Sequence, residues 1–180
     1  MKNLLFNYGL QALGNPLRII CNKNIDFDKA GQQDPFSMHY VWTPHKEKFP
    51  LDVPLPHQFD ICSLRVKNEG RLCMASFTSD VNESEDYFLI GIQGIILLGL
   101  QYPDAMQDLL KQIPRTDRRA IVSPAYAFGQ DRVLCDIGEA RVPWFCDHEG
   151  KISISFSRSV ASSIRQNDIV ILGRKIEESS

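Results

Sequence analysis

The 180-residue sequence lacks a hydrophobic segment long enough to cross a bilayer as a helix, which takes about 20 apolar residues. Its one long apolar run covers 87–100 (YFLIGIQGIILLGL) and is interrupted by glycines and a glutamine. The first 16 residues contain no continuous apolar region of the length found in signal peptides. These absences predict a cytoplasmic protein with no membrane span.

An excess of charge of one sign is also lacking. The 20 Lys and Arg residues against 22 Asp and Glu residues give a net charge of −2, so we predict no nucleic-acid binding. The hydrophobic content of 43% and charged content of 23% are typical of globular proteins. The length suits a single domain over 1–180, with a possible boundary near 114–117 between an N-terminal α+β part and a C-terminal β part.

Paired cysteines are absent as well, since no Cys-x-x-Cys motif occurs. An odd and scattered set of thiols in a chain of this size predicts reduced, mostly buried cysteines. The five are Cys21, Cys62, Cys73, Cys135 and Cys146.

The motifs of common catalytic and cofactor sites are missing too. The sequence has no P-loop, no dinucleotide fingerprint in its required context, and no recognisable Ser-His-Asp set or pair of catalytic carboxylates. We therefore predict no cofactor and favour a protein without catalytic activity.

The apolar run is the feature around which a core must form, because burying each large side chain contributes about 1.5–3 kcal/mol. Asn82 and Glu85 precede it with the spacing of a capping box, which predicts that a helix begins there. The alternative is a hairpin that turns at Gln93-Gly94. A second helix is predicted from Pro103, which suits the first helical position. Together these helices form a central helical segment, about 82–113.

The clearest predicted hairpin joins Phe59–Val66 to Arg71–Phe77 through a four-residue loop ending in glycine. This pairing would make Cys62 and Cys73 diagonal neighbours on the buried face, close enough for a disulfide. Two packed thiols are the favoured interpretation.

Further short strands are predicted at Leu17–Cys21, Met38–Trp42, Ala120–Phe128, Arg132–Ile137, Arg141–Cys146, Lys151–Ser157 and Asp168–Gly173. The predicted class is therefore α+β and antiparallel β-rich, with a small C-terminal barrel or sandwich packed on the central helical segment.

A proline-rich ribbon between Asp34 and His57 contains five prolines and cannot be a long helix or a central strand. Its aromatic and histidine side chains are typical of a protein-binding surface, and a stiff ribbon loses little entropy on docking. The candidate contact residues are His39, Tyr40, Trp42, His45 and His57. The three histidines among them do not have the spacing of a zinc site, so contact with another protein or a second copy is preferred.

A basic cluster follows the second predicted helix and consists of Arg115, Arg118 and Arg119. Arg115 and Arg119, followed by Asp136, resemble the PilZ family, which has Arg-x-x-x-Arg before a small barrel and then Asp-x-Ser-x-x-Gly. Gly138 and Arg141 depart from the second motif. The resemblance implies an alternative function as a cyclic-dinucleotide or anion sensor.

A second alternative involves Cys135, Cys146 and His148, which lie on neighbouring predicted strands. Cys146 and His148 are two residues apart and would share one face of a strand, as a thiol nucleophile and its base require. The same residues are candidate metal ligands. The leading hypothesis nevertheless remains a non-catalytic interaction module, such as a subunit, adaptor or inhibitor, which binds through the ribbon.

Overall fold

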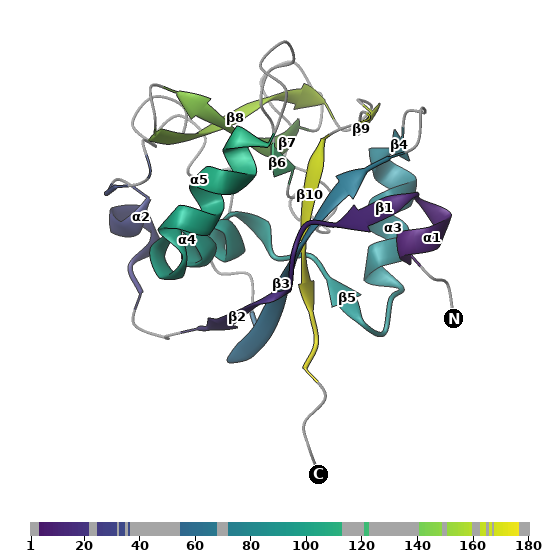
Figure 1. The fold of residues 1–180 in the computed structure, drawn as a ribbon, viewed down its shortest axis with the longest axis horizontal. Helices are drawn as coiled ribbons and strands as arrows, with labels where there is room; N and C mark the ends of the chain where they lie inside the picture. The colour runs from purple at the N-terminus through teal and green to yellow at the C-terminus, as the bar shows by residue number, and fades with distance from the viewer. Residues whose placement is uncertain are drawn as a thin grey trace.

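The structure, a computed structural model, describes residues 4–21, 25–31, 33–34, 36, 55–67, 72–112, 121–122, 141–148, 151–159, 163–164, 166 and 168–176. Within these residues an antiparallel sheet is combined with helices, which confirms the α+β class (Figure 1). The helices are α1 (Leu4–Asn7), α2 (Phe27–Ala30), α3 (Met74–Asn82), α4 (Gly91–Gln101) and α5 (Pro103–Lys111). The strands are β1 (Leu10–Ala12), β2 (Leu17–Ile20), β3 (Gln58–Val66), β4 (Leu72–Cys73), β5 (Tyr87–Phe88), β6 (Ile121–Val122), β7 (Arg141–His148), β8 (Lys151–Ser159), β9 (Ser163–Ile164) and β10 (Ile169–Arg174).

The main sheet has the strand order β1-β3-β10-β6-β7-β8, with β2 also paired to β3 and β5 also paired to β10. Its pairs are antiparallel except for β10 with β6. The expected C-terminal barrel or sandwich is not found among the described strands. Instead β6, β7 and β8 continue the sheet that β3 and β10 share, and that sheet is open.

Four of the predicted strands correspond closely to β2, β7, β8 and β10. Within the strand predicted at Ala120–Phe128, the structure describes only Ile121–Val122, which form β6. The strands predicted at Met38–Trp42 and Arg132–Ile137, and the boundary predicted near 114–117, lie outside the described residues.

Helices cover both faces of the sheet at β3 and β10. Helices α4 and α5 lie on one side of the sheet in Figure 1, and α1 and α3 lie on the other. Consecutive residues of β3 are therefore buried, which is what a strand covered on both faces requires. The core on the α4 side contains Ile19, Phe59, Ile61, Ile95, Leu98, Met106, Ile169 and Ile171, and the core on the α3 side contains Leu10, Leu64, Val66, Phe77, Val81, Val170 and Leu172.

The central apolar run is a helix only from Gly91 onward, so the prediction of a helix that begins at Asn82 was wrong. Asn82 is the last residue of α3, and Tyr87 and Phe88 form β5 against the end of β10. Helix α4 begins without a side-chain cap at Gly91, whose φ is 59°. Burial of the apolar run against the sheet therefore determines the position of α4, rather than a capping box. The second helix, α5, has Pro103 in its first turn as predicted.

The predicted hairpin between Phe59–Val66 and Arg71–Phe77 was also wrong. The first segment is a strand, but it pairs with β1, β2 and β10. The second segment divides into β4, which pairs with β9, and the first turn of α3. Cys62 and Cys73 are both free thiols, so no disulfide joins them. The expectation that both pack on one buried face was wrong, because Cys62 is buried and Cys73 is exposed. Across the described residues, no helix has the length and apolar character needed to cross a membrane.

Candidate functional site

His57 is the described member of the proposed ribbon site, and it lies exposed immediately before β3. Its carbonyl oxygen accepts a hydrogen bond of 2.8 Å from the N–H of Cys21, and its Nδ1 lies 3.1 Å from the Cys21 carbonyl oxygen. The residue thus extends the pairing of β2 with β3. The other ribbon candidates, His39, Tyr40, Trp42 and His45, lie outside the described residues.

Of the two alternative sites, the basic cluster lies outside the described residues and the thiol or metal site is described only in part. Arg115, Arg118, Arg119 and Cys135 lie outside the described residues, so the anion-sensor interpretation stays a prediction. Cys146 and His148 are paired through the β7 backbone with Ser153 and Lys151 of β8. Their side chains are not among those described, and the thiol or metal site therefore also stays a prediction. Within the part of the chain that the structure describes, no three His, Cys, Asp or Glu side chains are grouped to hold a metal ion.

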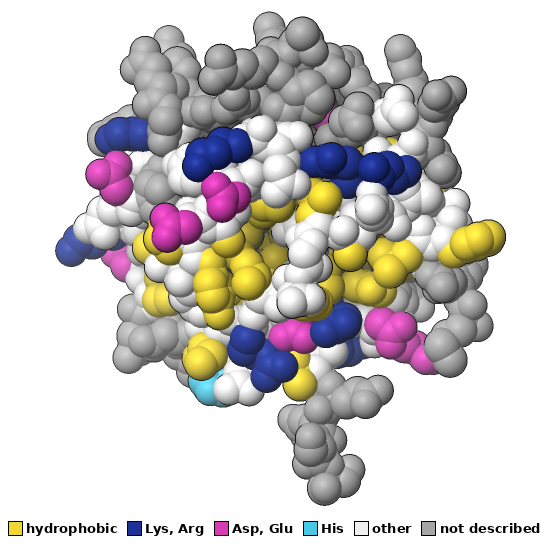
Figure 2. All heavy atoms as spheres, in the orientation of Figure 1, with side chains coloured by type: hydrophobic (Ala, Val, Ile, Leu, Met, Phe, Trp, Pro, Cys, Tyr) yellow, Lys and Arg dark blue, Asp and Glu magenta, His cyan; other side chains and the backbone are white. Residues whose placement is uncertain are grey.

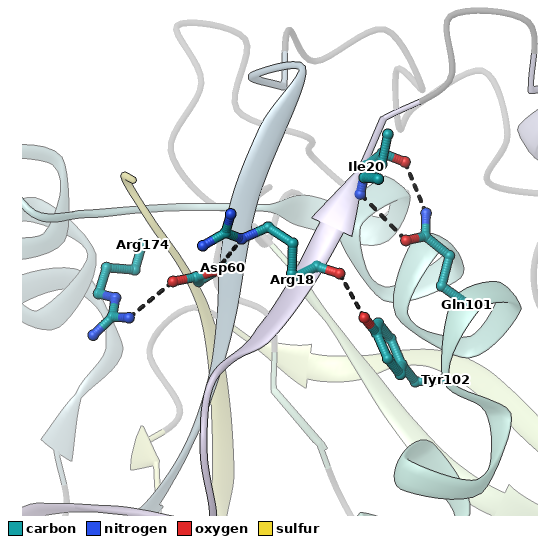
Figure 3. A network of polar contacts seen from close by, with 6 residues as sticks. All are labelled: Arg18, Ile20, Asp60, Gln101, Tyr102 and Arg174. Carbon is teal, nitrogen blue, oxygen red and sulfur yellow. Dashed lines mark hydrogen bonds and ion pairs between the residues drawn. The ribbon is translucent and has the colours of Figure 1, made fainter. Parts of the chain in front are cut away.

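A row of charged residues that the sequence analysis did not identify crosses three strands of the sheet (Figure 3). Asp60 in β3 stands opposite Arg18 of β2 on one side and Arg174 of β10 on the other. The Asp60 Oδ1 accepts from Arg18 Nε at 2.7 Å, and Oδ2 accepts from an Arg174 terminal nitrogen at 2.8 Å. One carboxylate thus connects two arginines that are 42 and 114 residues away in the sequence.

The two arginines determine the protonation of Asp60. Burial alone would raise the pKa of this carboxyl, but the hydrogen bonds and charges of Arg174 and Arg18 outweigh burial and lower it. The hydrogen bond that Arg174 donates to Asp60 in turn raises the pKa of Arg174. Asp60 is therefore an ionised structural carboxylate rather than a general acid.

The thiols of Cys21 and Cys62 lack the features of a nucleophile. Burial raises the pKa of Cys62, more than the nearby Arg174 lowers it, and burial also raises the pKa of Cys21. A thiolate, not a thiol, is the reactive form, so the raised pKa of each group favours its less reactive thiol form near neutral pH. The geometry therefore offers no thiol chemistry at these two positions.

The edge of the sheet beside β3 is built from two short strands, β1 and β2, which pair with different parts of the same strand. Between them the chain makes a turn at Gly14, whose φ is 82°. In β2 the Cys21 N–H bonds to β3, so by the alternation of an antiparallel ladder the backbone groups of Arg18 and Ile20 point away from β3. In β1 the Leu13 N–H bonds to the Ser63 carbonyl at 2.8 Å, which directs the backbone groups of residues 10 and 12 outward.

The outer edge of β2 is closed by the junction of α4 and α5 (Figure 3). Gln101 Oε1 accepts from the Ile20 N–H at 3.2 Å, and Gln101 Nε2 donates to the Ile20 carbonyl at 2.8 Å. The Tyr102 hydroxyl donates to the Arg18 carbonyl at 2.8 Å. These side chains occupy the positions that a neighbouring strand would otherwise fill, as proteins require at an exposed edge.

The outer edge of β1 differs from that of β2 in the part of the chain that the structure describes. No described residue makes a hydrogen bond to the outward backbone groups of Leu10 and Ala12. Gln11 and Ala12 are exposed, and Leu10 anchors the strand in the core. The three residues carry no charge and no proline, the side chains that usually protect such an edge.

Exposed hydrophobic side chains lie in or near the elements that form the edge beside β3. The face that carries β1, β2, α4 and α5 has a band of hydrophobic side chains across its middle, with charged groups above and below (Figures 1 and 2). Phe6 in α1, four residues before β1, is 84% exposed, and Ile20 and Leu100 are 50% and 38% exposed. The carbonyl of Phe6 accepts from Gly9 at 3.2 Å, which fixes α1 to the start of β1. We define the β1 edge site as Phe6 with Leu10–Ala12.

The sequence offered weak signals for these features. The segment from Leu10 to Ala12 is too short for its alternation to be read, and nothing local shows that it lies at an edge.

No protein-family model matches the chain, and neither the curated proteins nor the solved structures contain a match.

Proposed function

We propose that the protein is a non-catalytic interaction module that binds a protein partner by strand addition at the β1 edge site. The observation that carries the proposal is the contrast between two adjacent edges of one sheet. Gln101 and Tyr102 close the β2 edge, whereas the outward groups of Leu10 and Ala12 bond to no described residue. A strand added there would form main-chain hydrogen bonds and extend the sheet.

Phe6 supports the proposal because it supplies what a bare strand edge lacks. Main-chain pairing gives affinity with little selectivity, and an aromatic side chain is the usual anchor of a protein interface. Phe6 is 84% exposed, so much of its surface faces solvent. The ribbon that contains His39, Tyr40, Trp42 and His45 is proposed as a second contact region of the same module.

Site-specific photo-cross-linking tests this proposal. A photoreactive amino acid placed at Gln11 in the β1 edge site should form discrete covalent adducts in the native cells. The same amino acid at Asp104, exposed in the first turn of α5, is the matched control and should not. Adducts at Gln11 should be lost with Ala12→Pro, which removes an outward N–H. Equal labelling from both positions, or adducts that survive Ala12→Pro in a folded variant, would refute the proposal.

A further inference from the structure

The β1 edge is complementary to itself. Leu10 and Ala12 each direct one N–H and one C=O outward, so the edge carries two donors and two acceptors, with Gln11 between them. When two such edges meet antiparallel about a two-fold axis at Gln11, Leu10 of one copy lies opposite Ala12 of the other. Each pair then exchanges both of its hydrogen bonds, and no outward group at the edge is left without a partner.

We propose that the partner of the β1 edge site is a second copy of this chain, paired antiparallel through β1 with Gln11 on the two-fold axis. This inference rests on the strand-addition function proposed above and names its partner. A two-fold contact uses the same surface twice, which is the commonest arrangement in protein oligomers.

Charge favours this occupant. The sequence of β1 is Leu-Gln-Ala, so no like charges face each other across the axis. The amide of Gln11 can donate to and accept from the amide of the other Gln11. A strongly charged peptide would find no complementary charge in the strand itself.

The chain on either side of β1 also fits the register. Antiparallel pairing about Gln11 brings the α1–β1 junction of each copy next to the turn at residues 13–16 of the other. At Gly14 in that turn, an added Cβ would have no other atom within 4 Å. Gly14 therefore leaves space for a side chain of the other copy in this register.

The contact is small, so the dimer should be reversible. A stable interface buries about 800 Å² on each partner, and a strand pair of this length falls well below that area. Sedimentation should therefore show monomer in dilute solution and dimer as the concentration approaches the millimolar range. Phe6→Ala should shift this equilibrium toward monomer without loss of folded structure, because the side chain it removes is 84% exposed.

A disulfide trap tests the register. Opposed residues of a non-hydrogen-bonded antiparallel pair have Cα atoms about 4.5 Å apart, within the range that a disulfide can bridge. Gln11→Cys should therefore form a covalent dimer under mild oxidation and release it with reductant. Ala12→Cys is the matched control, because in this register Ala12 faces Leu10 and its two copies lie too far apart to be joined. Both variants are compared with the unsubstituted protein, whose Cys73 is exposed.

We expect Gln11→Cys to form covalent dimer. Ala12→Cys should form no more covalent dimer than the unsubstituted protein. Covalent dimer from Ala12→Cys instead would show that the strands pair in another register. If neither variant formed more covalent dimer than the unsubstituted protein, the homodimer would be excluded. Either result overturns the inference. In both cases photo-adducts at Gln11 with a different protein would leave the strand-addition function standing. Loss of those adducts as well would refute the proposed function itself.

Discussion

The side-chain amide of Gln101 bonds to both backbone groups of Ile20, as a neighbouring strand would. The contact joins the end of α4 to an edge strand 81 residues earlier in the sequence. It closes the β2 half of the edge beside β3, whereas no described side chain bonds to the outward groups of β1 in the same way.

Substitution of Gln101 should open the β2 edge. Gln101→Glu keeps the size and one acceptor, but its carboxylate cannot donate to the Ile20 carbonyl. We expect a loss of about 0.5–1.5 kcal/mol in the free energy of unfolding for the missing hydrogen bond. Chemical denaturation measures the loss, and hydrogen exchange should show faster exchange of the Ile20 amide. Unchanged exchange at Ile20 would show that Gln101 does not close this edge.

Replacement of Asp60 by Asn should destabilise the protein in a pH-dependent manner. The pKa of Asp60 is lowered in the folded state, so its ionised form stabilises the protein above the unfolded pKa of about 3.9. This stability is lost as the pH falls through the lower folded pKa. At neutral pH we expect Asp60→Asn to cost about 1.5–3 kcal/mol, the value of hydrogen bonds to a charged group.

Denaturation of both proteins across the acid range measures this effect. The difference in unfolding free energy between the two proteins should be constant near neutral pH and should shrink below about pH 3.9. A difference that does not change with pH would show that the Arg18–Asp60–Arg174 row does not couple folding to ionisation.

Gly99 is required by a close approach of Phe36. A Cβ at position 99 would collide with the Phe36 ring, which is buried in the core on the α4 side. Gly99→Ala should therefore destabilise the protein by about 1–3 kcal/mol from overpacking, although alanine favours a helix. The cost should fall when Phe36→Leu is combined with it.

Gly14→Ala is the control for the combination of Gly99→Ala with Phe36→Leu. Its cost in unfolding free energy arises from the φ of 82° at Gly14 and not from a contact. We expect about 1–2 kcal/mol, the same with and without Phe36→Leu. Unfolding free energies of the single and double variants provide the test. A cost of Gly99→Ala that is independent of residue 36 would contradict the packing explanation.

The cysteines should differ in reactivity. Cys62 is buried and its pKa is raised, whereas Cys73 is exposed. Iodoacetamide at neutral pH should label Cys73 rapidly and Cys62 only on unfolding, and mass spectrometry of the peptides distinguishes them. Rapid labelling of Cys62 in the folded protein would be inconsistent with its position in the core.

The sequence predicted the elements that local pattern determines. The strands at 17–20 and 169–174 and the helix from Pro103 have clear apolar patterns bounded by proline or polar residues, and they are present. The class of fold followed from these patterns.

The errors arose where distant partners override local preference. Asn82 and Glu85 have the spacing of a capping box, yet Tyr87 and Phe88 gain more by pairing with β10 than by continuing a helix. The row of Arg18, Asp60 and Arg174 could not be foreseen, because its members come together only through the order of the strands. The β1 edge could not be predicted either, because three residues are too few to show the alternating pattern of a strand.

Hydrogen exchange at single amides in the dilute, monomeric protein tests the central claim of an open binding edge most directly. The amides of Leu10 and Ala12 should exchange almost as fast as in an unfolded chain. The amides of Leu13 and Ile20, which are bonded to Ser63 and Gln101, should exchange slowly. On binding of a partner strand, Leu10 and Ala12 should become slow as well. Amides of Leu10 and Ala12 that are already as slow as Leu13 in the dilute protein would contradict the account.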